Sequence, residues 1–210
     1  MVFIYTVGLK PTNQEKEQLN KRFNQGRAVY NFTIKELLKR FNKLKKDPLY
    51  KKAYKLPKGA ERNSILKELD SIYDLQGKFS ASKITKEARK VLMLEDYLYS
   101  DLCIVIGFRA WNAFSKMKFA NGANRINFSE RMDSLVASRL NKGICVIDDT
   151  LLFGMKRKKD TLIKVKINFT NDDFEKEVFK NKLLYWQLIR KEFEGSFRYY
   201  LQAVMDGNPP

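Results

Sequence analysis

Residues 12–46 read TNQEKEQLNKRFNQGRAVYNFTIKELLKRFNKLKK, and the rest of the chain is organised around this stretch. Apolar or small residues recur in it at alternating steps of three and four, which predicts one long amphipathic helix. These residues are Leu19, Phe23, Gly26, Tyr30, Ile34, Leu37, Phe41 and Leu44. Thr12 and Glu15 directly follow Pro11 and predict a capping box at the start of the helix.

The face of this helix opposite the apolar stripe is basic. At about 100° per residue, that face carries Lys21, Lys35, Lys39, Lys43 and Lys46. Arg27 lies at its border, beside Tyr30. Like charges on one helix face repel each other unless an anion lies between them, so this pattern indicates an anionic partner.

The charge of the whole chain points in the same direction. Lys and Arg total 41 against 24 Asp and Glu, which gives a net charge of +17. Residues 1–60 alone hold 15 basic and 4 acidic side chains, so most of the excess lies around the long helix. Such a balance favours a polyanion as partner, with nucleic acid first. The alternative is a merely solubilising surface on a lysine-rich protein.

The two ends of the chain show the two-residue period of β-strands. Residues 1–9 alternate Phe3, Tyr5, Val7 and Leu9. Further strands are predicted at 125–129, 143–147, 150–153, 162–169, 183–193 and 197–205, with a short helix starting at 171–174. Glu194-Gly195-Ser196 predicts a hairpin between the last two strands. Because one strand is not stable alone, residues 1–9 are expected to join this sheet.

The middle of the chain is predicted to be helical. After the long helix, helices are expected at 62–75, 80–92 and 96–118, which makes about four in total. Trp111 and Phe114 are expected in the core. Residues 45–59 read as a basic connector in which Tyr50 and Tyr54 either stack on a nucleic acid or tether the loop to the core. The helical block is thus an insertion into a β domain made from both chain ends.

Composition excludes several kinds of catalytic site. There is no histidine, so no Ser-His or Cys-His couple exists, and no phosphate-binding glycine loop occurs. Asp148-Asp149 reads as a turn and Asp172-Asp173 as a helix cap. Cys103 and Cys145 are expected to be buried small hydrophobes. We therefore predict no catalytic and no metal-binding residue.

The N-terminal apolar run is interrupted by Lys10 and Pro11, so it does not resemble a signal peptide. No apolar stretch reaches the length that spans a membrane. The sequence therefore predicts a cytoplasmic protein without a membrane partner.

Three groups of residues resemble the TnpB family of transposon-encoded RNA-guided nucleases and the related type V CRISPR effectors. The first is the Lys-Pro-Thr turn followed by Arg27-Ala28-Val29-Tyr30-Asn31. The second comprises Arg109-Ala110-Trp111-Asn112-Ala113-Phe114, Lys118-Phe119-Ala120 and Arg125-Ile126-Asn127-Phe128. The third comprises Leu188-Ile189-Arg190-Lys191, Glu194 to Gln202 and Met205 to Pro210. Their order along the chain resembles the N-terminal portion of that family.

The resemblance implies an α+β fold, with an OB-like antiparallel β barrel, called the wedge domain, interrupted by a helical recognition lobe. The barrel would comprise residues 1–10 and 121–210, and the lobe residues 11–120. The implied partners are a guide RNA and the target DNA, with a short target-adjacent motif also read. Ser129-Glu130 departs from the family, which places further basic residues there.

In the resembling family a metal-dependent nuclease with a zinc ribbon would follow Pro210, so Mg and Zn are expected only there and no cofactor in this chain. The chain is then expected to be either the N-terminal portion of a longer nuclease or a naturally shortened binder. Its further partners would be a C-terminal nuclease half or a second copy of itself.

The candidate nucleic-acid-binding residues are basic side chains and the family-like motif on the long helix. They are Lys10, Lys21, Arg27, Tyr30, Asn31, Lys35, Lys39, Lys43, Lys46, Lys51, Lys52, Lys116, Lys118, Lys156, Arg157, Lys158, Lys159 and Arg198. For Tyr30 the alternative is a place in the apolar stripe, and for Arg27 an ion pair with a carboxylate. Lys156 to Lys159 form a loop between two strands, which is either solvated or in contact with RNA.

Two other classes of function remain open at this stage. One is a transcriptional regulator that binds DNA without a guide, which predicts tight binding to one duplex sequence. The other is a helical interaction module whose apolar stripe pairs with another protein or a second copy. Nucleic-acid binding should weaken steeply with ionic strength, whereas helix pairing should not.

Overall fold

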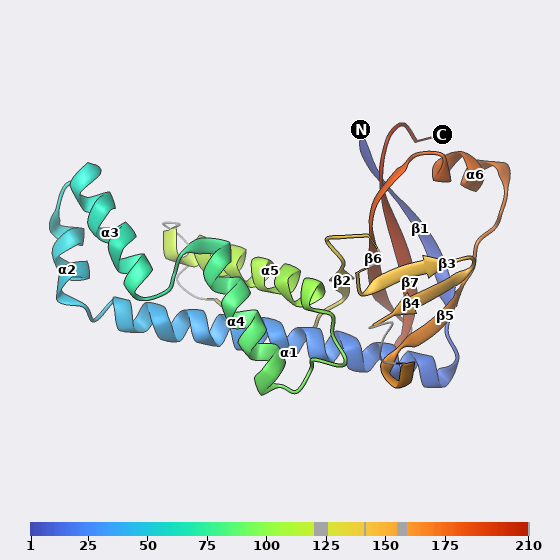
Figure 1. Cartoon of the computed structure of the whole chain (residues 1–210), viewed down its shortest axis with the longest axis horizontal. Coiled ribbons are helices and arrows are strands. Elements are labelled where there is room, and N and C mark those ends of the chain that lie inside the picture. Colours follow the sequence, from blue (N-terminus) through green and yellow to red (C-terminus); the bar gives the residue numbers. More distant parts are fainter. Residues whose placement is uncertain (120–125, 141, 155–158, 210) are drawn as a thin grey trace.

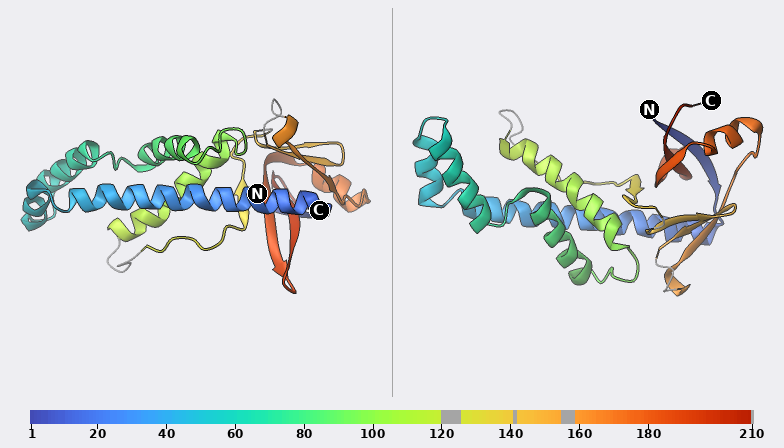
Figure 2. Two further views of the ribbon diagram at one scale, coloured as in Figure 1. Left: turned by 90° about the horizontal axis from the view of Figure 1, so that it is seen from below. Right: turned by 45° about the horizontal axis from the view of Figure 1, so that its top comes forward.

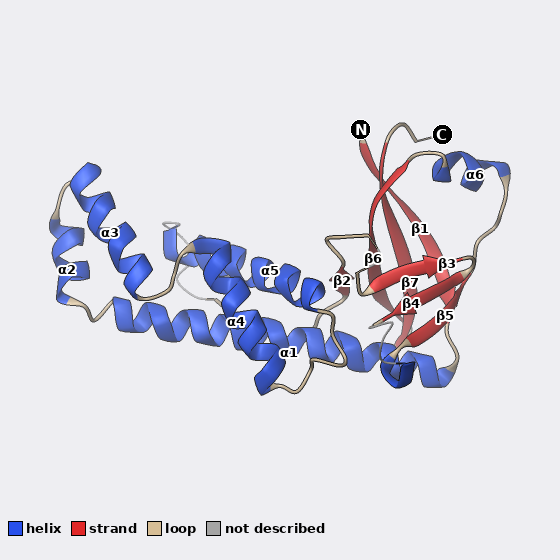
Figure 3. Ribbon diagram, viewed as in Figure 1, coloured by secondary structure: helices blue, strands red, loops and turns tan. Residues whose placement is uncertain are grey.

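The computed structural model describes residues 1–119, 126–140, 142–154 and 159–209 of the chain. The fold is α+β, with strands gathered at one end and the long helices extending from them (Figure 3). The strands are β1 (Val2–Lys10), β2 (Ser134–Val136), β3 (Ile144–Ile147), β4 (Thr150–Phe153), β5 (Ile163–Ile167), β6 (Lys182–Phe193) and β7 (Ser196–Asp206). The helices are α1 (Asn13–Leu44), α2 (Pro48–Lys55), α3 (Ala60–Ile72), α4 (Gly77–Val91), α5 (Ser100–Phe119) and α6 (Asp173–Phe179), with a short 3-10 helix η1 (Lys159–Thr161).

The seven described strands form one antiparallel sheet in the order β2-β6-β7-β1-β5-β4-β3. β3 approaches β6, so the sheet curls into a nearly closed barrel. β1 pairs with β7 along most of its length and with β5 at Leu9 and Lys10, which confirms that the first strand joins the late ones. The chain ends described here meet at the barrel, where the Met1 ammonium lies 3.6 Å from Asp206 (Figure 1).

The β6-β7 hairpin is confirmed together with its turn. Glu194 and Gly195 have φ of 48° and 74°, as a two-residue type I′ turn requires. This turn matches the right-handed twist of the two strands, which are the longest of the sheet. The predicted strands at 143–147, 150–153 and 162–169 correspond to β3, β4 and β5, and the helix predicted near 171–174 corresponds to α6.

α1 runs from the barrel along the length of the molecule (Figure 2). Its predicted capping box is present, because Glu15 N donates to Thr12 Oγ1 (3.3 Å) and Thr12 N donates to Glu15 Oε2 (2.7 Å). The first half of its apolar stripe packs with the barrel and α5, and the second half with α3, α4 and α5. α1 therefore carries the core of both parts of the molecule.

The central residues of α5 are buried, as predicted. Trp111 and Phe114 lie in the core shared with the second half of α1. Cys103 and Cys145 are both buried. None of the helices in the described part of the chain combines the length and hydrophobicity that a membrane span needs.

The region between α1 and α3 was expected to be a connector, and that prediction is wrong. It contains α2, which Asp47 caps by accepting a hydrogen bond from Leu49 N (2.8 Å), with Pro48 in the first turn. Asp followed by Pro is a helix-start signal, but the lysines around it led to the prediction of a basic connector. Five described helices, α1–α5, thus lie between β1 and β2, one more than predicted.

Two helix starts also differ from the prediction. α4 begins at Gly77 and not at residue 80, and α5 begins at Ser100 and not at 96. Gly77 has φ of 65° and opens α4, whereas Asp74, with φ of 51°, follows the end of α3. The left-handed residue in the connection between the two helices is therefore Asp74.

The strand predicted at 125–129 is absent from the described residues of that range, 126–129. The backbone N–H and C=O of Ser129 are both bonded to the Asn31 side chain, so they are not available to a β ladder. β2, which follows, was not predicted because three residues are too few to show a period of two.

Candidate nucleic-acid interface

A basic groove of about 440 Å³ runs along the outer face of the second half of α1. It is lined by Lys35, Leu38, Lys39, Asn42, Lys43, Lys46 and Phe128. We call this the α1 groove. Four of the five lysines predicted on the basic face of the helix therefore line one shallow groove, and the fifth, Lys21, lies nearer the barrel.

The positive charge of the α1 groove is mostly uncompensated. Lys39 lies 3.7 Å from Glu36, which is only 19% exposed. Across the described ranges, no carboxylate lies within 4.0 Å of the ammonium groups of Lys35, Lys43 or Lys46. Like charges four residues apart destabilise a helix by about 0.2–0.5 kcal/mol a pair. An anion in the groove would remove this cost and gain attraction from all four side chains.

Phe128 lines the groove together with these lysines and is 51% exposed. It belongs to residues 126–133, which directly precede β2. An exposed aromatic ring beside lysines is the arrangement on which single-stranded nucleic acids stack a base, at about 1–3 kcal/mol per base. Phe128 was not among the predicted site residues, because no local sequence pattern links it to a helix about 90 residues earlier.

The family-like motif on α1 holds the segment that carries Phe128. Arg27 Nη1 donates to the Glu130 carbonyl (2.6 Å). Asn31 Nδ2 donates to the Ser129 carbonyl (2.9 Å), and Ser129 N donates to Asn31 Oδ1 (2.8 Å). Tyr30 is half-buried against the core, and this burial raises the pKa of its hydroxyl. Arg27 and Asn31 therefore position the groove wall, whereas Tyr30 belongs to the apolar stripe.

The lysines of α2 extend the basic surface at the end of α1. Lys51 and Lys52 are exposed. Tyr50 packs at right angles on Phe41, with ring centroids 6.4 Å apart, and therefore tethers α2 to the core. Tyr54 is half exposed, and the Arg62 guanidinium lies 4.5 Å from its ring centroid. Of the two roles predicted for these tyrosines, stacking on a nucleic acid and attachment to the core, Tyr50 has the second.

The remaining predicted side chains are not gathered with the groove. Lys10, Lys116 and Arg198 are exposed on β1, α5 and β7 respectively. The side chain of Lys118 is only 5% exposed and forms an ion pair with Asp70, so it is directed into the structure. Lys156, Arg157 and Lys158, and the side chain of Lys159, lie outside the described residues.

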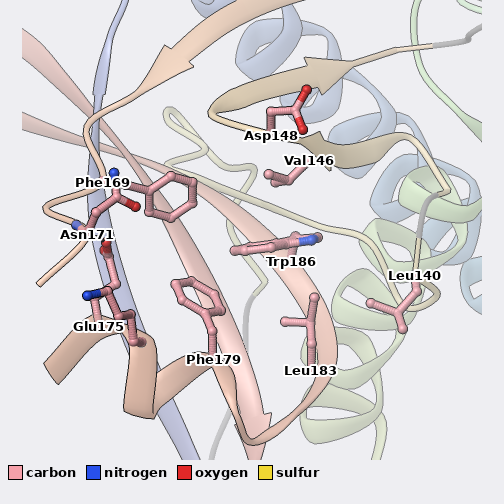
Figure 4. Close-up of a pocket in the computed structure, with 10 residues that line it drawn as sticks. Leu140, Val146, Asp148, Phe169, Asn171, Glu175, Phe179, Leu183 and Trp186 are labelled. Atoms are coloured by element: carbon pink, nitrogen blue, oxygen red, sulfur yellow. Dashed lines mark hydrogen bonds between the residues drawn. The ribbon is translucent and has the colours of Figure 1, made fainter. Parts of the chain in front are cut away.

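A second and larger pocket, of about 490 Å³, opens at the mouth of the barrel beside α6. Phe169, Phe179 and Trp186 lie around it (Figure 4). Glu175 is buried, and its two oxygens accept hydrogen bonds from Tyr5 Oη (2.9 Å) and Asn171 N (2.7 Å). Burial and the Glu175 carboxylate together raise the pKa of Tyr5 to about 12. The Glu175 carboxylate thus links β1 to the start of α6 through these two hydrogen bonds.

The described residues bring no three His, Cys, Asp or Glu side chains into a group able to hold a metal ion. The buried Cys103 thiol has its pKa raised to about 12 by burial, so it is protonated at neutral pH. A low thiol pKa is what makes a cysteine reactive, and Cys103 has the opposite.

The chain matches no known family model and no curated protein. The class of function must therefore be inferred from the surface of the molecule. In the α1 groove, lysines without an ion-pair partner among the described residues and an exposed aromatic ring line the same hollow.

Proposed function

We propose that this protein binds nucleic acid in the α1 groove. The observation that carries the proposal is that Lys35, Lys43 and Lys46 line the same groove as the exposed ring of Phe128. Within the described residues, none of these three lysines has an ion-pair partner. The lysines would contact backbone phosphates, and Phe128 would stack on a base or at the end of a duplex. Phosphate contacts and stacking of this kind carry little sequence information.

More specifically, we propose an RNA-guided DNA-targeting protein of the TnpB type, acting in the cytoplasm. A barrel built from β1 and β2–β7, with α1–α5 between them in the chain, supports this proposal because the resemblance implies that arrangement. Helices α1–α5 would then hold the guide–target heteroduplex, and the barrel, as an OB-like wedge domain, would bind the guide RNA. Base pairing would supply most of the specificity, with a short target-adjacent motif read by protein.

The interaction-module alternative is disfavoured by burial. Leu19, Leu37 and Leu44, the centre of the apolar stripe, have no exposed surface because the stripe already packs against the barrel and helices α3–α5. A second copy of the chain could not reach them without unfolding this core.

The test is to express the protein together with the genomic locus that neighbours its gene, to purify the protein, and to sequence the nucleic acid that remains bound. A single discrete RNA ending in a variable guide supports the RNA-guided proposal. Random cellular RNA overturns that finer proposal and leaves general nucleic-acid binding. A preparation that binds neither RNA nor DNA overturns both, and one duplex sequence bound tightly without RNA favours the regulator.

A further inference from the structure

A small pocket of about 190 Å³ lies where the first turns of α1 meet η1 and the connection between α4 and α5. Its lining residues are Gln18, Lys21, Arg22, Tyr97, Asp160 and Thr161. Pockets for whole small molecules measure roughly 300–1,000 Å³. This one therefore suits a single small group.

Arg22 forms a buried wall of this pocket, with 5% of its surface exposed. Its Nη2 donates to the Thr161 carbonyl (2.6 Å) and its Nη1 to Gln25 Oε1 (3.2 Å), while its Nε has no acceptor. Both acceptors are neutral. A buried guanidinium normally has a carboxylate partner, yet within the described part of the chain none lies within 4.0 Å of Arg22.

The surroundings make this charge more costly. Lys21 is exposed on the same pocket and adds a second positive charge. Asp160 is exposed at the rim and, within the described residues, forms no ion pair with either cation. The Tyr97 ring lies 4.8 Å from the Arg22 guanidinium carbon and 5.7 Å from Lys21 Nζ, which attracts both cations without neutralising them. Burial correspondingly lowers the pKa of Arg22.

We propose that this pocket binds one phosphate group between Lys21 and Arg22. Arginine presents a planar fork of N–H donors that matches phosphate oxygens, and lysine adds a point charge. The phosphate would supply the counterion that Arg22 lacks. We call this the Arg22 pocket.

The source of the phosphate rests on the proposed function, and we assign it to a nucleic-acid backbone. Lys21 and Lys35 are 14 residues apart on α1, which corresponds to about 21 Å along the helix and about 40° around it. A strand that follows the helix from the α1 groove toward the barrel therefore reaches the Arg22 pocket. Backbone phosphate and free inorganic phosphate share the same chemistry, and the experiment separates them.

The first measurement is thermal unfolding in inorganic phosphate and in sodium chloride of equal ionic strength. Phosphate should raise the unfolding temperature of the wild type more than chloride does, and this difference should vanish in Lys21→Ala and Arg22→Met. Lys180→Ala, which changes an exposed lysine directly after α6, is the charge-matched control and should keep it. An equal response of the wild type to the two salts overturns the proposal.

Arg22→Met also separates binding from a purely structural role. Without phosphate, it should unfold at the same temperature as the wild type or higher, because it removes a buried charge that has no counterion. A lower unfolding temperature would mean that the Arg22 hydrogen bonds to Thr161 and Gln25 also serve the fold, and the phosphate response of Lys21→Ala then decides the proposal. Lys21→Ala changes only an exposed side chain, so its phosphate response stays readable even if Arg22→Met fails to fold.

The second measurement uses a single-stranded RNA. Lys21→Ala should reduce the slope of log affinity against log salt by about 0.7, the value for one phosphate contact on a single strand. If phosphate stabilises the protein and this slope does not change, the ligand is a free anion and the assigned source is wrong. If RNA binds but phosphate has no specific effect, the Arg22 pocket is wrong and the proposed function stands.

Discussion

Asn31 on α1 holds both backbone groups of Ser129, 98 residues later in the chain. Its Nδ2 donates to the Ser129 carbonyl (2.9 Å) and its Oδ1 accepts from Ser129 N (2.8 Å). This pair of bonds fixes the segment that leads into β2 against the long helix. It thereby sets the position of Phe128, the neighbouring residue, at the edge of the α1 groove.

Replacing Asn31 should therefore affect both stability and binding. Asn31→Ala removes two hydrogen bonds and leaves Ser129 without its partner, so we expect a loss of about 1–3 kcal/mol in the free energy of unfolding. Urea denaturation measures this loss. Asn24→Ala changes an exposed asparagine on the same helix outside the α1 groove, and as the control it should change stability by less than about 0.5 kcal/mol. Equal stability of the two variants would contradict the positioning role.

Phe128 gives a test of stacking that is separate from charge. Phe128→Ala should weaken binding to a single-stranded RNA by about 1–3 kcal/mol, because one stacked base is lost. The slope of affinity against salt should not change, since no phosphate contact is removed. Fluorescence anisotropy at several salt concentrations measures both quantities. Phe128→Tyr keeps an aromatic ring and should bind like the wild type, and a Tyr variant as weak as the Ala variant would exclude stacking.

Lys118 should behave unlike the groove lysines, although all were predicted to contact nucleic acid. Its ammonium group is buried and paired with Asp70. Lys118→Ala should therefore lower the free energy of unfolding by about 2 kcal/mol, the scale of a hydrogen bond to a charged group. Lys116→Ala, an exposed neighbour on α5, should be near neutral. Calorimetry of both variants measures these changes in stability. If Lys118→Ala is as stable as the wild type and binds RNA more weakly, Lys118 contacts nucleic acid and does not serve the fold.

The Tyr5–Glu175 hydrogen bond predicts a pH dependence at the alkaline end. The pKa of Tyr5 is about 12 in the folded protein and 10.0 without these surroundings. Unfolding therefore favours loss of the phenol proton, so this contribution is complete below pH 10 and is lost as pH rises toward 12. Relative to Tyr5→Phe, which cannot ionise, the wild type should lose stability over that range. A constant difference between the two proteins from pH 9 to 12 would show that the pKa is not raised.

The sequence predicts the elements whose patterns are local. α1 is recognisable because its stripe is long and its capping box is complete, and β6-β7 because Gly195 marks the turn. The groove lysines follow from the same helical period. α2 was missed because a run of lysines obscured the Asp47-Pro48 start.

Other features depend on contacts between distant residues, which no local pattern reveals. The segment at 126–129 is not a strand because Asn31 binds it, and this contact spans 98 positions. In the sequence, Arg22 only precedes Phe23 of the apolar stripe. Its pocket forms because Arg22 bonds to Thr161, which lies 139 residues later in the chain. Phe128 becomes a groove residue only through the same long-range packing.

The most direct test of nucleic-acid binding in the α1 groove is the salt dependence of RNA affinity in a triple variant. Lys35, Lys43 and Lys46 are changed to Ala, and the control changes three exposed lysines outside the groove, Lys67, Lys90 and Lys180. Both variants lower the net charge equally. We predict that the slope of log affinity against log salt falls by about 2 in the groove variant, for three lost contacts on a single strand, and is unchanged in the control. Equal slopes in the two variants, or wild-type binding that does not depend on salt, would contradict the account.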